Sequence, residues 1–351
     1  MRILTITDLF INKKVVETAL RENLSFIDNL VIDNFSVDFP ITPLQYSDGE
    51  VTEYVGSEED IVERIGDIDH LVVHTAPVTR RVLMHGKRLK TISVTRGGAV
   101  NVNVEAASEL NIPVFFTPGR NSNAVAEFTI GLFIAETRNI ARSHETLRQG
   151  KWVDEYYIYE KSEYELSSKV IGLLGYGNIG EKVCRLLGGF GSRVLIYDPY
   201  VVNLGNANAQ LVDLPTLLSE SDIISLHMRV TPETRGMINM ELIKKMKPTA
   251  ILVNTARGPL IDYGDLYDAL EKGVIARAAL DTFDVEPVSP DNPFLKLENV
   301  TLTNHIAGAS RDAAHISAKI MATDLRNFLN GKPVKNIMNP EVLRNCKTYE
   351  V

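Results

Sequence analysis

Three side chains that can do acid–base or anion-binding chemistry follow strand-like apolar runs in the second half of the chain. Arg257 comes after "AILVNTA", Glu286 after "AALDTFDV", and His305 after "VTLTN". An imidazole takes or gives a proton near neutral pH, and a carboxylate beside it orients the ring and stabilises its charged form. A guanidinium holds a carboxylate by two contacts and polarises a forming carbonyl. Together these groups suit the dehydrogenation of an alcohol next to a carboxylate.

Each of these residues also has an ordinary structural interpretation. A histidine at the end of a strand is more often a hydrogen-bonded residue than a catalyst. Arg257 could cap a helix or pair with a surface acid, and Glu286, which precedes Pro287, could be a solvated loop carboxylate. The choice depends on whether the same part of the chain can hold a hydride acceptor.

A glycine-rich turn provides a site for such an acceptor. Gly175, Gly177 and Gly180 form G-x-G-x-x-G between the apolar run "KVIGLLG" and a helical pattern that includes Asn178 and Ile179. In this context the glycines permit a tight turn, a close approach of the backbone to a pyrophosphate, and close packing of helix on strand. The amino end of the helix adds unpaired N–H groups and a positive dipole. The alternative is a structural strand–helix turn that binds nothing.

Asp198 indicates which nucleotide the turn would hold. It ends the next strand-like run, "RVLIYD", eighteen residues after Gly180. A carboxylate there accepts hydrogen bonds from the ribose hydroxyls and repels a 2′-phosphate, so NAD is predicted rather than NADP. His227, at the end of "DIISLH", is another imidazole at a strand end, and it is either structural or adjacent to the cofactor.

The composition is that of a globular protein without a strongly basic or membrane-spanning part. The 351 residues are 44% apolar and 23% charged, with a net charge of −8, which argues against a general nucleic-acid or anionic-membrane surface. The longest apolar run, residues 128–135, is far shorter than the ~20 residues that span a bilayer. Cys184 and Cys346 lie far apart without CxxC spacing, so neither a disulfide framework nor a metal site is expected. We expect a cytoplasmic protein.

Strand-like runs alternate with helical periodicity along nearly the whole chain, which is typical of α/β folds with parallel sheets. The expected strands of the first third are "RILTIT", "HLVVHT", "KTISVT" and "IPVFFT". Those of a second unit are "KVIGLLG", "RVLIYD", "DIISLH", "AILVNTA", "ARAALDTF" and "VTLTNHI". Between the two units, residues 123–152 carry apolar side chains at helical spacing and predict one long helix. A last helix is expected to stop at Gly331, two residues before Pro333.

Several stretches together resemble the D-isomer-specific 2-hydroxyacid dehydrogenases. The matching segments, in the family's order, are "VTRGGAVNVNVEAA", "TPGRNSNAVAEFTIGL", "VIGLLGYGNIGEKV", "TPETRGMIN", "MKPTAILVNTARGPLID", "AALDTFDVEP" and "NHIAGAS". The similarity covers nearly the whole chain. The resemblance implies an NAD-dependent oxidoreductase that acts on the CH–OH group of a small 2-hydroxy acid. In the reverse direction the enzyme would be a 2-keto acid reductase. The phosphoglycerate and hydroxypyruvate enzymes are possible types.

The resemblance also implies a role for each matching position. The catalytic residues would be Arg257, Glu286 and His305. The cofactor-binding residues would be Gly175, Gly177, Asn178, Ile179, Gly180, Asp198, His227, Thr255, Ala256 and Asp281, with Asp281 at the nicotinamide carboxamide. The substrate-binding residues would be Thr75, Arg96, Gly97, Gly98, Arg257 and His305. In the loop from Arg96 to Gly98 the substrate carboxylate would be held mainly by backbone N–H groups, which leaves the role of the Arg96 side chain open.

The implied architecture is two Rossmann-like or flavodoxin-like domains with parallel sheets and the active site in the cleft between them. A discontinuous substrate domain would comprise residues 1–118 plus 306–351, and an NAD-binding Rossmann domain residues 119–305. The helix after Pro118 matches the family's dimerisation element and implies a homodimer. Neither nucleic acid nor membrane is implied as a partner.

Two residues depart from the family's usual pattern. Arg229 and Asn304 both stand where a proline is common. Arg229 could suit an acidic or phosphorylated substrate, or it could pair with a local acid. Glu286 argues against a formate dehydrogenase, which has glutamine there. The particular 2-hydroxy acid and the physiological direction stay open, and an NAD(H)-sensing, corepressor-like binding protein on the same fold is the alternative function.

Overall fold

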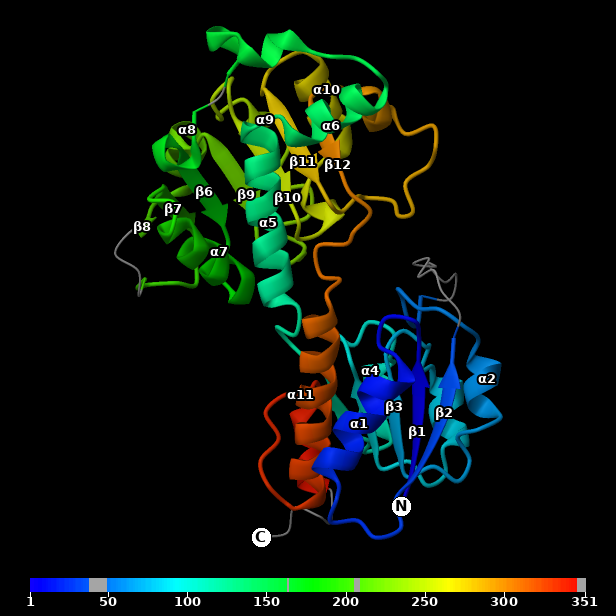
Figure 1. The fold of residues 1–351 in the computed structure, drawn as a ribbon. Helices are drawn as coiled ribbons and strands as arrows, with labels where there is room; N and C mark the ends of the chain where they lie inside the picture. The colour runs from blue at the N-terminus through cyan, green and yellow to red at the C-terminus, as the bar shows by residue number, and fades with distance from the viewer. Residues whose placement is uncertain (38–48, 163, 205–208, 346–351) are drawn as a thin grey trace. The chain divides into compact units, whose positions relative to one another are not determined.

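The computed structural model describes residues 1–37, 49–162, 164–204 and 209–345 (Figure 1). The chain forms two compact units. Unit 1 comprises Met1–Asn121 and Ala309–Val351, and unit 2 comprises Ser122–Gly308. The chain thus passes between the units at residues 121/122 and 308/309, where the sequence predicts 118/119 and 305/306. Cys184 is buried in unit 2, and Cys346 lies outside the described residues.

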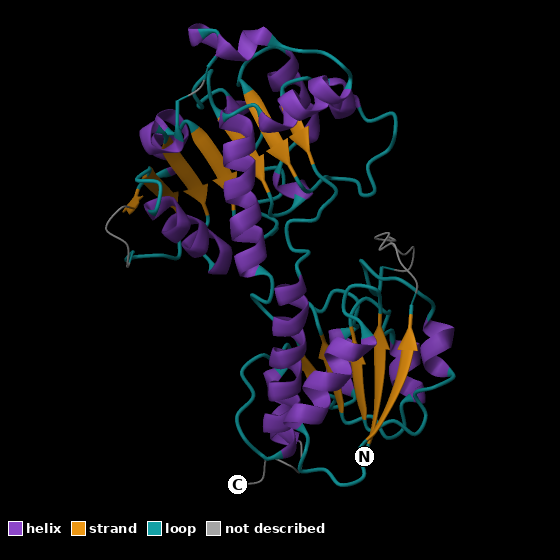
Figure 2. Ribbon diagram, viewed as in Figure 1, coloured by secondary structure: helices purple, strands orange, loops and turns teal. Residues whose placement is uncertain are grey.

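Unit 1 is a parallel five-stranded sheet with helices on both faces (Figure 2). Its strand order is β2-β1-β3-β4-β5, with bounds β1 (Arg2–Thr7), β2 (Val31–Ser36), β3 (His70–Val73), β4 (Thr91–Val94) and β5 (Val114–Phe115). One face packs on α1 (Lys13–Asn23) and α11 (Arg311–Leu329). The other packs on α2 (Glu58–Val62), α3 (Arg80–His85) and α4 (Val104–Glu109). Adjacent residues such as Ile3 and Leu4 enter opposite cores, as strand geometry requires.

Unit 2 is a parallel seven-stranded sheet, also covered on both faces. Its order is β12-β11-β10-β9-β6-β7-β8, with bounds β6 (Val170–Leu174), β7 (Arg193–Tyr197), β8 (Ala209–Leu211), β9 (Ile223–Leu226), β10 (Ile251–Asn254), β11 (Arg277–Leu280) and β12 (Val300–Leu302). Helices α5 (Ser122–Thr137) and α7 (Asn178–Gly188) cover one face. Helices α8 (Leu214–Glu220), α9 (Met240–Ile243) and α10 (Tyr263–Glu271) cover the other.

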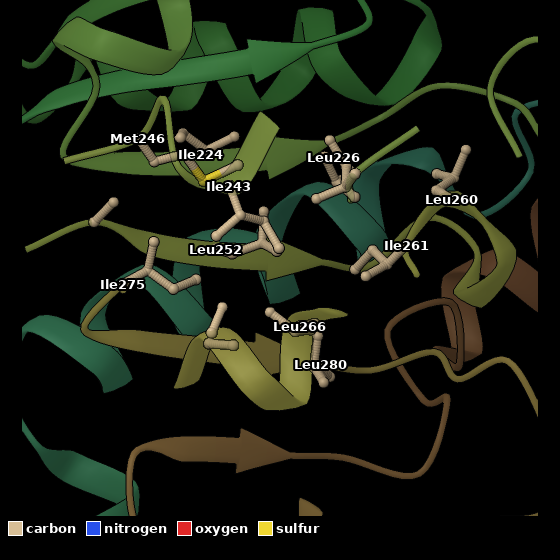
Figure 3. Close-up of a cluster of buried hydrophobic side chains, with 14 of the residues drawn as sticks. Ile224, Leu226, Ile243, Met246, Leu252, Leu260, Ile261, Leu266, Ile275 and Leu280 are labelled. Atoms are coloured by element: carbon tan, nitrogen blue, oxygen red, sulfur yellow. The ribbon is translucent and has the colours of Figure 1, made fainter. Parts of the chain in front are cut away.

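The strand register explains how the core of unit 2 is filled. Ile223 lies opposite Ile251 and Ile171 on neighbouring strands, and all three face α5 and α7. The next residues along, Ile224 and Leu252, pair with each other and face the opposite core, drawn in Figure 3. Because both faces are buried, these strands read as continuous apolar runs rather than alternating ones.

Each sheet reverses its strand order at one point. In unit 1 the reversal lies between β1 and β3, and in unit 2 between β6 and β9. Ligands of open α/β sheets bind outside the carboxyl ends of the strands at such a point. The polar residues that the sequence indicates as functional follow the carboxyl ends of strands in these two sheets.

Two expectations about elements are wrong or incomplete. Residues 123–152 are not one helix: α5 ends at Thr137 and α6 (Ile140–Arg148) begins after Asn139, whose φ of 52° is left-handed and breaks the helical path. Strands β2 and β8 are not among the predicted strands, and both are edge strands with partly exposed residues. None of the described helices is long and apolar enough to cross a membrane.

Candidate active site

His305 and Glu286 form a hydrogen-bonded pair at the carboxyl edge of the sheet in unit 2. His305 lies just beyond the end of β12 at Leu302, with a left-handed φ of 52°. Its Nδ1 is 2.7 Å from Oε2 of Glu286, whose other oxygen accepts the Phe283 N–H at 2.8 Å. Because an ionised carboxylate only accepts, Nδ1 carries the proton, which leaves Nε2 to exchange one with a ligand. The His305 side chain is 44% exposed and that of Glu286 is 18% exposed.

Asp281 supports the backbone on which His305 sits. It follows β11 and is fully buried. Its Oδ1 accepts from Thr303 Oγ1 at 2.6 Å and from the Ile306 N–H at 3.0 Å, and its Oδ2 accepts from the Ala307 N–H at 2.9 Å. These bonds flank His305 on both sides and fix its direction. The sequence indicates Asp281 only as a contact of the nicotinamide and does not reveal this positioning role.

The turn after β10 presents Arg257. The buried Asn254 side chain accepts from the Ala256 N–H at 3.0 Å and donates to the Arg257 carbonyl at 2.9 Å, which fixes the turn. The exposed guanidinium donates to the Ala256 carbonyl at 2.8 Å through Nη1. Gly258 packs so closely on the Phe283 carbonyl that an added Cβ would overlap it. The turns that carry Arg257 and Glu286 are therefore in direct contact, and Asn254 is a second positioning residue that the sequence did not reveal.

The glycine-rich turn joins β6 to α7 as the motif predicts. Gly175 has a φ of 101°, and an added Cβ would lie 2.7 Å from the His227 carbonyl oxygen. An added Cβ at Gly180 would overlap the Gly175 carbonyl, whereas at Gly177 it would meet nothing within 4 Å. Gly177 is the N-cap of α7 and provides no capping side chain. Open space and unbonded helix N–H groups thus coincide at the amino end of α7.

Asp198 lies one residue past the end of β7. Its Oδ2 accepts from the Tyr176 N–H at 2.8 Å and its Oδ1 from the Tyr200 N–H at 2.9 Å. The carboxylate is therefore fixed beside the glycine-rich turn. Among the described residues each oxygen accepts one of these bonds, which leaves each a lone pair for a ribose hydroxyl.

The remaining cofactor candidates lie near the same edge. His227 packs against the glycine turn, and its Nε2 lies 3.0 Å from Ser225 Oγ. Burial lowers the pKa of His227 to about 4, so its ring is neutral at physiological pH. Thr255 is buried, with its hydroxyl 2.8 Å from that of Thr129 on α5. His227 is thus part of the support of the glycine-rich turn.

The substrate candidates Thr75, Arg96, Gly97 and Gly98 lie in unit 1. Thr75 is buried and its hydroxyl donates to Asp8 at 3.2 Å. The Arg96 side chain pairs with the Glu53 carboxylate and donates to the Glu53 carbonyl at 2.7 Å. A Cβ added at Gly97 or Gly98 would meet nothing within 4 Å, so the backbone of this loop faces open space.

The two unusual residues are both on the surface of unit 2. Arg229 and Asn304 are exposed. Arg229 makes no ion pair with any residue that the structure describes. Nor do the described residues include a cluster of three or more His, Cys, Asp or Glu side chains able to hold a metal ion.

Comparisons with known proteins show what the chain is similar to. The family model for the D-isomer specific 2-hydroxyacid dehydrogenase NAD-binding domain matches residues 130–307. A glyoxylate reductase of Thermofilum pendens is 38% identical over 84% of this chain and 88% of its own length. A D-3-phosphoglycerate dehydrogenase of Methanocaldococcus jannaschii is 38% identical over 83% of this chain, but only 56% of that longer protein is matched. The crystal structure of the TT0316 protein from Thermus thermophilus superposes with a TM-score of 0.78 at 30% identity, covering 96% of this chain and 100% of that one.

The chain belongs to the D-isomer specific 2-hydroxyacid dehydrogenase family. Members of the family are NAD-dependent oxidoreductases that act on CH–OH groups. The predicted family, enzyme class, α/β fold and cofactor are thereby confirmed.

The residues at the glycine-rich turn fit the NAD of the 2-hydroxyacid dehydrogenases. The amino end of α7 offers N–H groups and open space at Gly177, as a pyrophosphate needs. Asp198 is fixed at the end of β7, where an adenosine ribose would place its hydroxyls and a 2′-phosphate would be repelled.

Proposed function

We propose that the protein reduces a small 2-keto acid to the D-2-hydroxy acid with NADH and catalyses the reverse oxidation with NAD. The observation that carries this proposal is the 2.7 Å contact between His305 Nδ1 and Glu286 Oε2, in the unit that also holds the glycine-rich turn. A pair of this kind prepares an imidazole for proton transfer at Nε2.

Each residue of the site would have a separate role in the reaction. In reduction, His305 would donate a proton from Nε2 to the keto oxygen, and Glu286 would stabilise the charged ring before that transfer. Arg257, with donors beyond the one bonded to Ala256, would hold the substrate carboxylate. In unit 1, the backbone of Gly97 and Gly98 faces open space and would offer N–H donors to an anionic group of the substrate. Bound NADH supplies the hydride that C2 receives.

Asp281 would keep His305 in place throughout the reaction. Three donors of the loop that carries His305 already bond to its carboxylate. Two oxygens of an ionised carboxylate accept about four bonds, so one acceptor position is left for the nicotinamide carboxamide. Positioning of His305 and contact with the carboxamide are therefore compatible in one side chain.

A panel of 2-keto acids tests this function. Glyoxylate, hydroxypyruvate, 3-phosphohydroxypyruvate and pyruvate are each mixed with protein and NADH, and the loss of NADH absorbance is followed. We expect at least one to be reduced with turnover near the usual enzyme range of about 1–10³ s⁻¹, and the product to be the D isomer. NADH binding without oxidation by any 2-keto acid would instead support the NAD(H)-sensing, corepressor-like alternative.

We also propose that the protein is a homodimer and that it acts in the cytoplasm. Support for the dimer comes from the segment that follows α5, where large apolar side chains are exposed: Ile140, Leu147, Trp152, Tyr157 and Tyr159, with Tyr157 98% exposed and Trp152 80% exposed. Exposed apolar side chains that gather in one segment are typical of interaction surfaces. The net charge of −8 supports the expectation that neither nucleic acid nor an anionic membrane is a partner.

Light scattering after gel filtration checks the dimer. We expect a mass of twice the 39.0 kDa chain, and we expect the double variant Trp152→Asp/Tyr157→Asp to run as a monomer, because two buried charges oppose an apolar interface. Met84→Asp, at an exposed apolar residue of α3 in unit 1, is the matched control and should stay dimeric. A wild-type mass of one chain at micromolar concentration would refute the dimer.

A further inference from the structure

A group of polar residues at the carboxyl edge of the unit 1 sheet is not explained by the chemistry of unit 2. Asp8 follows β1, His74 follows β3, Arg96 follows β4 and Arg120 follows β5. These strands include β1 and β3, between which the strand order reverses. The group therefore lies where an open α/β sheet binds its ligand.

Asp8 has all its hydrogen-bonding capacity in use. Its Oδ1 accepts from the Phe10 and Ile11 N–H groups at 2.9 and 2.8 Å. Its Oδ2 is bonded to His74 Nδ1 and accepts from Thr75 Oγ1 at 3.2 Å. Asp8, His74 and Thr75 are all buried. An ionised carboxylate has about four acceptor sites, so Asp8 has none left for a nearby guanidinium.

Arg120 is a cation with two buried donor nitrogens that have no partner among the described residues. Its guanidinium carbon lies 5.7 Å from the centre of the Phe10 ring, and its Nε and Nη1 atoms are buried without any hydrogen-bond partner among the described residues. Burial and then the charge of Arg96 lower the pKa of Arg120 to about 10, while Asp8 acts in the opposite direction. The side chain is therefore still charged at neutral pH. A buried charged donor without an acceptor is costly, and an anion that reached it would relieve that cost.

Hydrogen bonds join Arg120 to the loop that faces open space at Gly97 and Gly98. The Arg96 carbonyl accepts from the Thr117 N–H at 2.8 Å and from its hydroxyl at 3.1 Å. The Arg120 N–H in turn donates to the Thr117 carbonyl at 3.4 Å. The turn that carries Arg120 is thus fixed to the loop proposed to hold the substrate carboxylate.

We propose that Arg120 binds a second anionic group of the substrate, so that the preferred substrate is a 2-keto acid with a carboxylate or phosphate at its far end. This proposal rests on the proposed function, in which the backbone of Gly97 and Gly98, in the same unit as Arg120, offers donors to the first carboxylate of the substrate. Arg96 adds positive charge to the site but is already paired with Glu53. Arg120 is accordingly the residue that selects the second anion.

Matched substrate pairs test the proposal. Hydroxypyruvate is compared with 3-phosphohydroxypyruvate, and 2-oxopentanoate with 2-oxoglutarate, so that one arm adds a phosphate and the other a carboxylate. For each pair, the selectivity is the kcat/KM of the compound that has the second anionic group divided by that of the compound that lacks it. We expect wild-type protein to favour the compound with the second anionic group in at least one arm, and Arg120→Gln to lower that selectivity by about 10- to 100-fold, as the loss of a charge-assisted contact implies. The arm that responds identifies the second anion.

Two further variants keep the test decisive. Arg88→Gln is the matched control, because Arg88 bonds at 3.0 Å to Asp69, which precedes β3 at the opposite edge of the sheet, and its selectivity should equal that of wild type. If Arg120→Gln does not fold, Arg120→Lys takes its place, since it keeps the charge but loses the planar donor set and should also lower selectivity. Unchanged selectivity in both arms overturns the proposal while the proposed function stands. Failure of every keto acid tested to oxidise NADH overturns both.

Discussion

His305→Gln is expected to lower kcat for 2-keto acid reduction by about 10²- to 10⁴-fold, the contribution typical of a general acid. Glutamine has a similar size and can still donate to Glu286, but it cannot give up a proton at neutral pH. The dissociation constant of NADH should stay nearly the same, because His305 lies beyond β12, apart from the β6–α7 turn. Steady-state rates and NADH fluorescence titration provide the two readouts.

A matched control separates this effect from general damage. His315→Gln changes an exposed histidine of α11 in unit 1 and should leave kcat within about twofold of wild type, because exposed positions away from the site tolerate such changes. Near-normal turnover in His305→Gln, with the protein folded and saturated with NADH, would remove His305 from its proposed role. The Arg257–Glu286–His305 assignment would then need another proton donor.

Asp281→Asn is expected to have the largest effect on stability among the site residues. Asparagine would turn an amide N–H₂ toward donors of Thr303, Ile306 or Ala307, and it would lose the negative charge that strengthens those bonds. We expect a loss of roughly 2–4 kcal/mol in the free energy of unfolding, measured as a shift in urea denaturation. Misplacement of His305 should lower kcat by about 10- to 100-fold at a temperature where the variant is folded.

The control for this variant is Asp284→Asn, an exposed aspartate in the same loop. It should change the unfolding free energy by less than about 0.5 kcal/mol. If Asp281→Asn is as stable as Asp284→Asn, the three bonds to the loop do not hold His305 in place. A rise in KM for NADH in Asp281→Asn alone would add support for the carboxamide contact that the family resemblance implies.

The sequence could predict those parts of the site that are defined by a short sequence pattern. The glycine-rich turn needs only an apolar run, three glycines and a helix, and its geometry follows from local sterics at Gly175 and Gly180. Arg257 and Glu286 could be selected because each follows a buried strand, and the ends of parallel strands meet at one edge.

The residues that sequence reasoning missed act through contacts that a linear pattern does not show. Asn254 looks like the last residue of an apolar strand, and only the folded turn shows that its amide holds Ala256 and Arg257. Likewise, the support that Asp281 gives to residues 303–307 requires β11 and β12 to be neighbours. The unpaired donors of Arg120 depend on Asp8 being fully bonded elsewhere, which no spacing rule could reveal.

The discontinuous unit 1 also bears on the order in which a ribosome-bound chain can fold. The apolar face of α1 packs on α11 through Val16 and Leu20 against Met321 and Leu325. These last two residues are synthesised after the whole of unit 2. During translation, the apolar face of α1 that packs on α11 therefore stays uncovered until unit 2 has been synthesised. We therefore expect chaperones to contact α1 while the chain is being synthesised.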